Sequence, residues 1–308
     1  MNTKVARDIT LMTVLAAMAM AAFLCSLRFG AVIIGWQDMV VSLGDRFANR
    51  ESGLTERIFF EIRLPRALEC LLVGANLAMS GVLMQGLFRN PIVEPGLAGT
   101  SSGAAFGASL FFVAGSLFGF PAGQWGLPLA ACVGGALATM LVFILSGNRA
   151  SGKSSVVSLL LTGMALNALF LSGVGFASYI ARDPQARSIT FWNLGTLSGA
   201  NWTSVQIIGL TTALCFSIAS RYTRQLNALM LGESEAVLLG VELRKLQWTI
   251  MGLNILMVAV TTAFTGVISF VGLVVPHLMR MIRGSDNRFL LGASALMGAT
   301  LVTIADLV

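Results

Sequence analysis

The strongest constraint on this chain comes from long stretches that contain no formally charged side chain. Seven such stretches together hold 204 of the 308 residues. They are 9–27, 70–88, 95–148, 154–181, 188–220, 246–279 and 289–305. Because a helix needs only about 20 apolar residues to span a bilayer, the sequence predicts an all-α, polytopic membrane protein.

Charged residues make up only 11% of the chain, and hydrophobic residues make up 56%. A soluble domain carries roughly 25% charged residues, so this composition excludes soluble enzymes and secreted domains. The formal net charge of +6 would otherwise suggest nucleic-acid binding, but the basic residues lie in short loops between apolar runs. Such loop residues determine membrane topology, and no nucleic-acid partner is expected.

Two of the apolar runs are too long for one helix. The run 95–148 should break at the Gly and Pro residues of 119–123. The run 246–279 should also divide, and its last part, 268–280, is short and contains Pro276. A short or broken helix is expected there. With every other run counted once, the sequence has nine hydrophobic segments.

The charged loops favour an orientation with the N-terminus in the cytoplasm. If the segments alternate from there, twelve Lys and Arg residues lie inside and eight outside, in line with the usual excess of basic residues in cytoplasmic loops. The sequence stops at Val308 within an apolar segment, just after Asp306. We therefore expect the natural protein to continue and a tenth helix to follow Val308.

Cysteine and histidine chemistry is not indicated. Cys25, Cys70, Cys132 and Cys215 each lie singly in an apolar run, which is typical of buried packing. The lone His277 has no partners with which to build a zinc or haem site. No metal site and no cofactor are predicted.

The 33 glycines are too many for loops alone. Several follow one another at four-residue spacing, as at Gly99, Gly103 and Gly107. Small residues let helix backbones approach closely in a membrane, where the hydrophobic drive between helices is weak. Tight packing is the favoured interpretation, and helix sliding during transport is the alternative.

The motif Arg63-Leu64-Pro65-Arg66 stands near the outer end of the second span. Two arginines three residues apart lie on one helix face. They are either an anchor at the membrane interface or a docking point for carboxylates of a soluble partner, because Arg forms bidentate pairs with carboxylates.

The inner end of the same span contains Asn90, followed by Pro91 and Pro95. The prolines forbid a continuous helix, so Asn90 must adopt an extended or capping conformation. This segment is either a plain turn or a constriction in which Asn90 supplies an amide and Ile92 an apolar plug.

The stretch 224–244 is the largest segment expected on the inside. Gly232 interrupts it and Gly240 can end a helix there, which predicts two short amphipathic helices. A solvated loop does not need so many apolar side chains, so we interpret the stretch as a partner surface, with packing of these side chains within the chain as the alternative.

No residues for nucleotide hydrolysis are evident. Residues 147–154 read GNRASGKS, which fits the spacing of a phosphate-binding loop, but such a loop follows a β-strand and no strand is expected before residue 147. If the protein takes part in a process that consumes energy, another subunit must supply that energy.

The outer segment 182–202 offers Arg182, Arg187, Phe191 and Trp192 as a candidate substrate entrance. Arginines and aromatic rings suit a flat anionic chelate. They are also typical of an interfacial aromatic belt.

Three motifs resemble signatures of the FecCD-type permeases, the membrane subunits of bacterial type II ABC importers for iron–siderophore complexes, haem and vitamin B12. They are RLPRALECLLVGANLAMSGVLMQGLFRNPIVEPGLAGTSSGA (63–104), GESEAVLLGVELRKLQ (232–247) and FTGVISFVGLVVPHLMRMIRGSDNR (264–288). LVTIADLV (301–308) is similar to the segment that leads into a fourth signature of this family. The resemblance extends over nearly the whole chain.

This resemblance implies a single transmembrane permease domain over residues 1–308 with a ten-helix fold, located in the bacterial inner membrane. It implies a homodimer with two ATP-binding subunits inside and one periplasmic substrate-binding protein outside. The chain itself would not be an enzyme. It would carry an iron chelate, haem or a ferric siderophore, from periplasm to cytoplasm.

The resemblance also assigns roles to residues. Arg63 and Arg66 correspond to arginines that receive carboxylates of the binding protein. The gate of the pathway corresponds to Asn90, Ile92, Ser155 and Val156. The coupling to the ATPase corresponds to Leu231, Gly232, Glu233, Glu235, Leu238, Leu239 and Gly240.

Two alternatives remain open from the sequence. One is a cobalamin permease of the same family. The other is an ion-coupled secondary transporter, which would place an ionisable residue near the middle of the membrane. Glu69 is the candidate for that residue.

Overall fold

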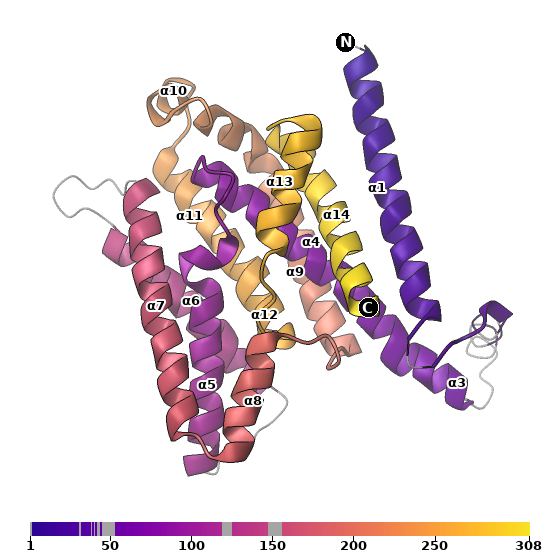
Figure 1. The fold of residues 1–308 in the computed structure, drawn as a ribbon. Helices are drawn as coiled ribbons and strands as arrows, with labels where there is room; N and C mark the ends of the chain where they lie inside the picture. The colour runs from indigo at the N-terminus through magenta and orange to yellow at the C-terminus, as the bar shows by residue number, and fades with distance from the viewer. Residues whose placement is uncertain are drawn as a thin grey trace.

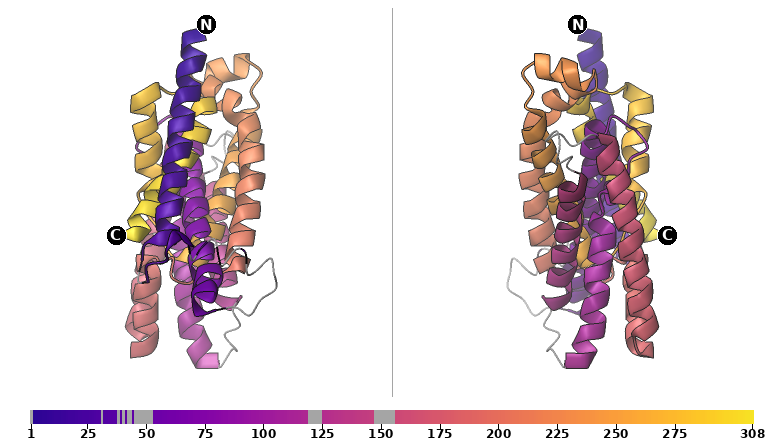
Figure 2. Two further views of the ribbon diagram at one scale, coloured as in Figure 1. Left: turned by 90° about the vertical axis from the view of Figure 1, so that its right-hand side faces the viewer. Right: turned by 90° about the vertical axis from the view of Figure 1, so that its left-hand side faces the viewer.

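A computed structural model of the chain describes residues 2–30, 32–37, 39, 41, 44, 53–118, 125–146 and 156–308. This described part is built from helices and contains no strand. The helices form an elongated bundle, and most of them run along its length (Figure 1 and Figure 2). The predicted all-α fold is confirmed.

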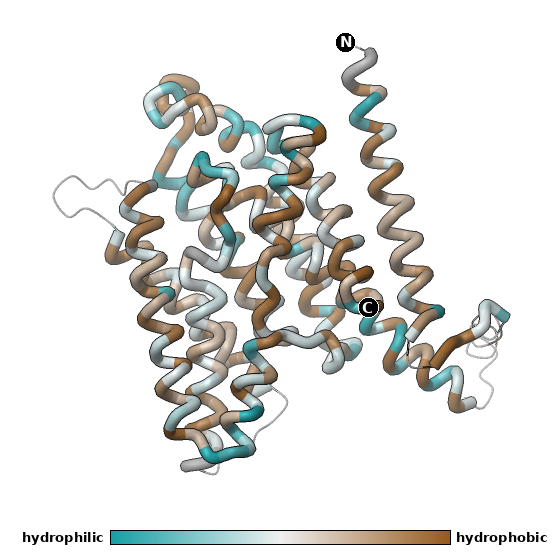
Figure 3. The backbone as a smooth tube through the Cα atoms, viewed as in Figure 1, coloured by the Kyte–Doolittle hydropathy of each residue, from teal (hydrophilic) through white to brown (hydrophobic). Residues whose placement is uncertain are grey.

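Seven helical spans of the described part are long and apolar enough to cross a membrane. They are Val5–Arg28, Leu54–Leu87, Gly126–Ser146, Val157–Ile180, Trp202–Leu229, Leu243–Thr265 and Asn287–Leu307, with Thr100–Gly115 as a shorter apolar helix. Hydrophobic residues follow the helices, and hydrophilic residues gather towards their ends (Figure 3). The protein is a multi-pass membrane protein.

The helices of the first half run from α1 to α7. They are α1 (Asn2–Arg28), α3 (Leu54–Arg57), the π-helix η1 (Ile58–Arg63), α4 (Leu64–Leu87), the 3₁₀-helix η2 (Pro95–Ala98), α5 (Thr100–Phe118), α6 (Gly126–Ser146) and α7 (Val156–Ile180).

The helices of the second half run from α8 to α14. They are α8 (Asp183–Leu194), α9 (Trp202–Leu229), α10 (Glu233–Leu238), α11 (Leu243–Asn254), the π-helix η3 (Ile255–Ala259), α12 (Val260–Thr265), α13 (Val271–Arg283) and α14 (Asn287–Leu307).

Helix α4 is the central helix and is buried along most of its length. It reaches its neighbours through glycines, because a Cβ added at Gly74 would lie 2.1 Å from the carbonyl oxygen of Gly298 in α14. A Cβ at Gly81 would lie 1.9 Å from the carbonyl oxygen of Gly272 in α13. Backbones therefore touch here, which confirms the interpretation of the glycines as packing residues.

Helices α5 and α6 pack in the same way. A Cβ at Gly103 would lie 2.5 Å from the carbonyl oxygen of Gly134, and one at Gly107 would lie 2.3 Å from that of Ala130. The four-residue spacing in the sequence therefore marks one face of α5, against which α6 lies.

The run 188–220 does not form the single segment counted from its hydrophobicity. It contains the end of α8 and most of α9, separated by a loop. Gly195 has a φ of +71° and ends α8. The side chain of Asn201 then caps α9, since its Oδ1 accepts from the backbone N–H groups of Thr203 and Ser204 at 3.0 Å. The turn at Gly195 and the cap at Asn201 therefore divide a run that hydrophobicity alone predicted to be one segment.

The predicted break near residue 266 is confirmed. Helix α12 ends at Thr265, Gly266 has a φ of +70°, and the short helix α13 contains Pro276. This break lies beside the loop after α8, because the N–H of Thr196 donates to the carbonyl oxygen of Thr265 at 2.7 Å. Two interrupted helices thus meet inside the bundle.

The second span begins well before the apolar run 70–88. Helices α3 and η1 continue α4 outward as one span, Leu54–Leu87. Pro65 has no N–H to donate to the preceding turn, and the π-helical turns of η1 come immediately before it.

Candidate functional site

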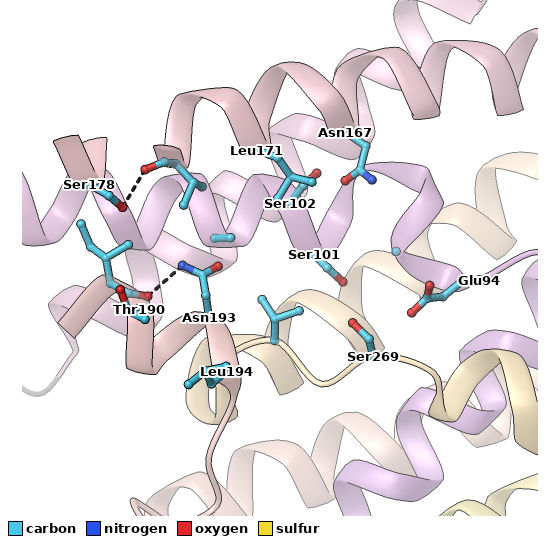
Figure 4. A pocket seen from close by; sticks show the side chains of 15 residues that line it. Glu94, Ser101, Ser102, Asn167, Leu171, Ser178, Thr190, Asn193, Leu194 and Ser269 are labelled. Atoms are coloured by element: carbon cyan, nitrogen blue, oxygen red, sulfur yellow. Dashed lines mark hydrogen bonds between the residues drawn. The ribbon is translucent and has the colours of Figure 1, made fainter. Parts of the chain in front are cut away.

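A cavity of about 560 Å³ opens between α5, α7, α8 and the segment that follows α12. Its polar lining is drawn in Figure 4. The polar side chains come from Glu94, Ser101, Ser102, Asn167, Ser178, Thr190, Asn193 and Ser269. Hydroxyl and amide groups thus alternate with aliphatic ones such as Leu171 and Val174.

Several of these polar groups already donate to their own helix. The Nδ2 of Asn193 donates to the carbonyl oxygen of Ile189 at 2.8 Å, and the Oγ1 of Thr190 to that of Ala186 at 2.9 Å. The side-chain oxygen atoms of these residues still have lone pairs that can accept a hydrogen bond from a molecule in the cavity.

Glu94 is the one charged side chain among the fifteen described residues that line the cavity. Its Oε1 accepts from the backbone N–H of Phe270 at 3.2 Å. Phe270 has a φ of +68° and immediately precedes α13. Glu94 therefore connects the cavity to the start of α13.

The predicted gate residues Asn90 and Ile92 lie four and two residues before Glu94, in the turn between α4 and α5. The Oδ1 of Asn90 accepts from the backbone N–H of Ile92 at 3.0 Å. This bond forms an Asx turn, so Asn90 leaves the helical conformation but caps no helix. The side chain of Ile92 is 71% exposed, so it is free to meet another surface.

The structure does not place the side chains of the other two predicted gate residues relative to this turn. Ser155 is outside the described residues, and Val156 begins α7 with a side chain that is not described.

The predicted coupling residues form a protruding tip at one end of the bundle, around α10 (Figure 1). Leu238 is 86% exposed and Leu239 is 64% exposed, whereas Ala236 is fully buried against the core. Gly232 and Gly240 bound the tip with φ values of +142° and +83°. Leu231 is also exposed, and Glu233 and Glu235 occupy the first turn of α10.

The stretch 224–244 holds one short helix rather than the predicted two. Helix α9 continues to Leu229 without a break, so only the part after Gly232 folds separately as α10. The segment before Gly232 has the core residues Leu226 and Leu229, and their burial extends α9.

The turn with Asn90 lies next to α10. Arg89 has a φ of +50°, and its Nη2 lies 3.4 Å from the Oε1 of Glu233. Both side chains are partly exposed, so this ion pair contributes little free energy. It does bring the predicted gate and the predicted coupling helix together.

The two outer arginines have partners within the chain. Arg66 binds Asp306 of α14 in a bidentate pair, with Nε–Oδ2 and Nη2–Oδ1 distances of 2.8 Å each. Arg63 donates to the carbonyl oxygens of Phe29 and Val32. The Arg66 side chain is still 38% exposed.

The predicted entrance residues do not share one surface. Arg182, Arg187 and Phe191 are exposed, whereas Trp192 packs on a core cluster formed by α5, α6 and α12. The part of α8 that lines the cavity carries Thr190 and Asn193 instead.

Sequence reasoning missed most of the cavity. Ser101, Ser102 and Ser269 lie within the FecCD-like motifs, and Asn193 lies within the outer segment 182–202, but no spacing in the sequence marks them as cavity residues. Asn167 did leave a signal, because it is the one amide side chain in the apolar run 154–181.

A family model described as the FecCD transport family matches residues 18–308. The chain is 40% identical over 251 residues to a hemin transport system permease protein of Yersinia pestis, covering 81% of this chain and 74% of that protein. It is 38% identical over 252 residues to a molybdate import system permease protein of Haemophilus influenzae, covering 82% and 72%. It is 34% identical over 290 residues to a vitamin B12 import system permease protein of Vibrio vulnificus, covering 90% and 82%.

The fold is also similar to a solved structure described as an inward-facing conformation of a metal-chelate type ABC transporter. The TM-score is 0.84 and the sequence identity is 33%, with 97% of this chain and 89% of the other covered.

Proposed function

Because the chain belongs to the FecCD transport family and is a permease of an ABC importer, we propose that it carries a metal chelate, haem or a ferric siderophore, from periplasm to cytoplasm. The observation that carries the proposal is the position of Glu94. It lines the polar cavity and also ends the turn that holds Asn90 and Ile92. A path along the cavity therefore leads directly to this turn.

The proposed assembly contains two copies of this chain as single-domain permeases. Two copies related by a two-fold axis would bring their cavities and their Ile92 side chains together. The path would then run between the subunits, and Asn90, Ile92, Ser155 and Val156 would close it at the inner end.

We assign the end with α10 and the N-terminus to the cytoplasm of a bacterial cell, with the chain in the inner membrane. The excess of basic residues at that end supports this orientation. Two ATP-binding subunits would dock on the exposed residues around Leu238, and ATP hydrolysis would take place on them.

A periplasmic binding protein would dock at the opposite end, where Arg63 and Arg66 lie. Its carboxylates would compete with Asp306 for Arg66, whose side chain is partly exposed. Arg182 and Arg187 are exposed at the same end and would attract an anionic cargo.

Haem is our first choice of cargo, and it is supported by the identity to the hemin permease. Cobalamin is the second candidate, supported by the longer alignment with a vitamin B12 permease. The arginines near the entrance favour an anionic chelate, whereas the hydroxyl and amide lining of the cavity suits either cargo.

The deciding experiment is uptake into proteoliposomes that contain the permease with its ATP-binding subunits and binding protein. Haemin, a ferric siderophore and cobalamin are offered in parallel, with ATP or with a proton gradient. ATP-dependent uptake of one compound identifies the cargo. Uptake driven by the gradient without ATP would overturn the proposal and restore the secondary-transporter alternative. In that alternative the ionisable residue would be Glu69, which is buried and accepts a hydrogen bond from the hydroxyl of Ser204.

A further inference from the structure

Helix α13 has a gap in its hydrogen bonding that its own sequence creates. In an α-helix the N–H of residue 276 would donate to the carbonyl oxygen of residue 272. Pro276 has no N–H, so the carbonyl group of Gly272 is left without its helical donor. An unpaired backbone carbonyl inside a membrane bundle costs free energy, and a donor must come from elsewhere.

Gln85 of α4 supplies that donor. Its Nε2 lies 3.3 Å from the carbonyl oxygen of Gly272 and 3.2 Å from that of Leu273. The Gln85 side chain is completely buried. The contact is possible because Gly81 and Gly272 let the two backbones touch one turn away. One amide thus repairs the proline break from a neighbouring helix.

Arg280 completes the arrangement further along α13. Its Nη1 donates to the Oε1 of Gln85, which fixes the orientation of the amide so that Nε2 faces the carbonyl groups. The Nε and Nη2 of Arg280 are buried and have no hydrogen-bond partner among the described residues. A guanidinium held this way is costly, so stability alone does not explain it.

The turn that contains Asn90 and Ile92 is bonded to α4 at its start and to the residue before α13 at its end. The carbonyl oxygen of Gln85 accepts from the N–H of Asn90 at 3.2 Å, which starts the turn. Glu94, at the far end of the turn, accepts from the N–H of Phe270 ahead of α13. Helix α13 is therefore attached both before and after the turn that contains Asn90 and Ile92.

We propose that Gln85 and Arg280 are positioning residues that hold α13 to the inner turn, so that the two move together when the path opens. The inference rests on the proposed role of this turn as a gate. Neither residue is expected to touch the cargo. They act by transmitting a displacement of α13 to Asn90 and Ile92.

The test is a double-mutant cycle between Gln85→Met and Pro276→Ala. Methionine keeps the length of the side chain and removes the amide donor. Hydrogen–deuterium exchange in peptides that contain residues 270–284 should then accelerate about tenfold, the factor expected for one lost buried hydrogen bond. The Pro276→Ala change restores a backbone N–H that can donate to Gly272, so the double variant should return to within about threefold of Pro276→Ala alone.

Matched controls separate this effect from general loosening. Gln185→Met makes the same change in α8 and should leave exchange in 270–284 unaltered. Arg280→Leu should accelerate exchange there, and Arg280→Lys should restore most of the protection, because Lys can still donate to the Oε1 of Gln85.

Two results would overturn the inference: unchanged exchange in Gln85→Met, or an equal acceleration with and without Pro276. Haemin efflux from vesicles, measured on the same variants, then tests the gate. The expected exchange pattern, combined with no haemin transport by the wild type or any variant, would remove haemin as the cargo and leave the positioning role of Gln85 intact. Altered exchange with unaltered efflux, in vesicles that do transport haemin, would count against the link between α13 and the gate.

Discussion

Asn90 shows how one side chain shapes the inner end of the bundle. The prolines on its C-terminal side prevent the helix from continuing, and its Oδ1 closes the turn by accepting from the N–H of Ile92. This leaves Ile92 projecting with 71% of its surface exposed. An exposed isoleucine on a hydrogen-bonded turn is suited to contact its copy across a dimer axis.

We expect the double change Asn90→Gly and Ile92→Ala to open the path in the absence of ATP. Burying an isoleucine is worth about 1.5–3 kcal/mol, so its loss should raise leakage roughly tenfold or more. Efflux of haemin from vesicles with the assembled transporter measures this. Leu54→Ala, an exposed residue at the opposite end, is the control, and a tight bilayer with the double variant at normal protein levels would remove the gate.

Arg66 is engaged with Asp306, and this pair refines the docking prediction. Changing Arg63 and Arg66 to Glu should weaken binding of the periplasmic protein, with each lost charge-assisted pair worth about 1.5–3 kcal/mol. Binding is measured by titration at low and high salt. The reversed charges should also remove part of the salt dependence.

Asp306→Asn is the informative control for this prediction. It breaks the internal pair but leaves both arginines positive, so binding should be unchanged or tighter. If Asp306→Asn weakens binding as much as the charge reversal does, the arginines are internal anchors and the docking role is wrong.

Helix α10 and the residue after it carry apolar side chains that the chain itself does not bury. Its residue Ala236 is buried in the core, while Leu238 and Leu239 face outward. The two glycines at its ends allow the sharp turns that expose it. An apolar tip on a short, well-anchored helix is suited to a protein partner.

Leu238→Asp together with Leu239→Asp should release the ATP-binding subunits. Charged groups at the interface would have to lose water without gaining partners, at roughly 1–3 kcal/mol each. Co-purification of the ATP-binding subunits and their transport-coupled hydrolysis are the measurements. The Ala pair at the same positions loses only contact area and should have a smaller effect, and an intact complex with the Asp pair would contradict the assignment.

At the scale of the whole molecule, helices far apart in the sequence are joined through glycine. Gly74 and Gly298 bring α4 and α14 into backbone contact, and α4 in turn carries the segment that reaches the cavity. The relative positions of the helices therefore depend on a few sites without side chains.

Gly74→Ala should lower the melting temperature of the purified protein, because overpacking a close contact costs about 1–3 kcal/mol. Gly175→Ala in α7 is the matched control, since a Cβ there meets nothing within 4 Å. Thermal unfolding of the two variants in detergent decides the point. Equal melting temperatures would show that the contact between α4 and α14 can relax at no cost.

The sequence alone determined the fold class, the family and the helix breaks at Pro91 and Gly266. Charge-free runs of sufficient length can only span a membrane. Pro91 and Gly266 interrupt helices through their own backbone chemistry, and Pro276 removes one hydrogen-bond donor from α13. These are local properties, which is why they can be read without a structure.

Only the tertiary structure decided which residues meet. It placed α8 as a separate short helix, joined Arg66 to Asp306, and brought Ser101, Asn167 and Asn193 into one cavity. It also showed that Gln85 repairs the break at Pro276. These contacts join residues that are far apart in the chain. Local sequence can mark a helix face that packs closely, but which helix lies against that face is set by the packing of the whole bundle.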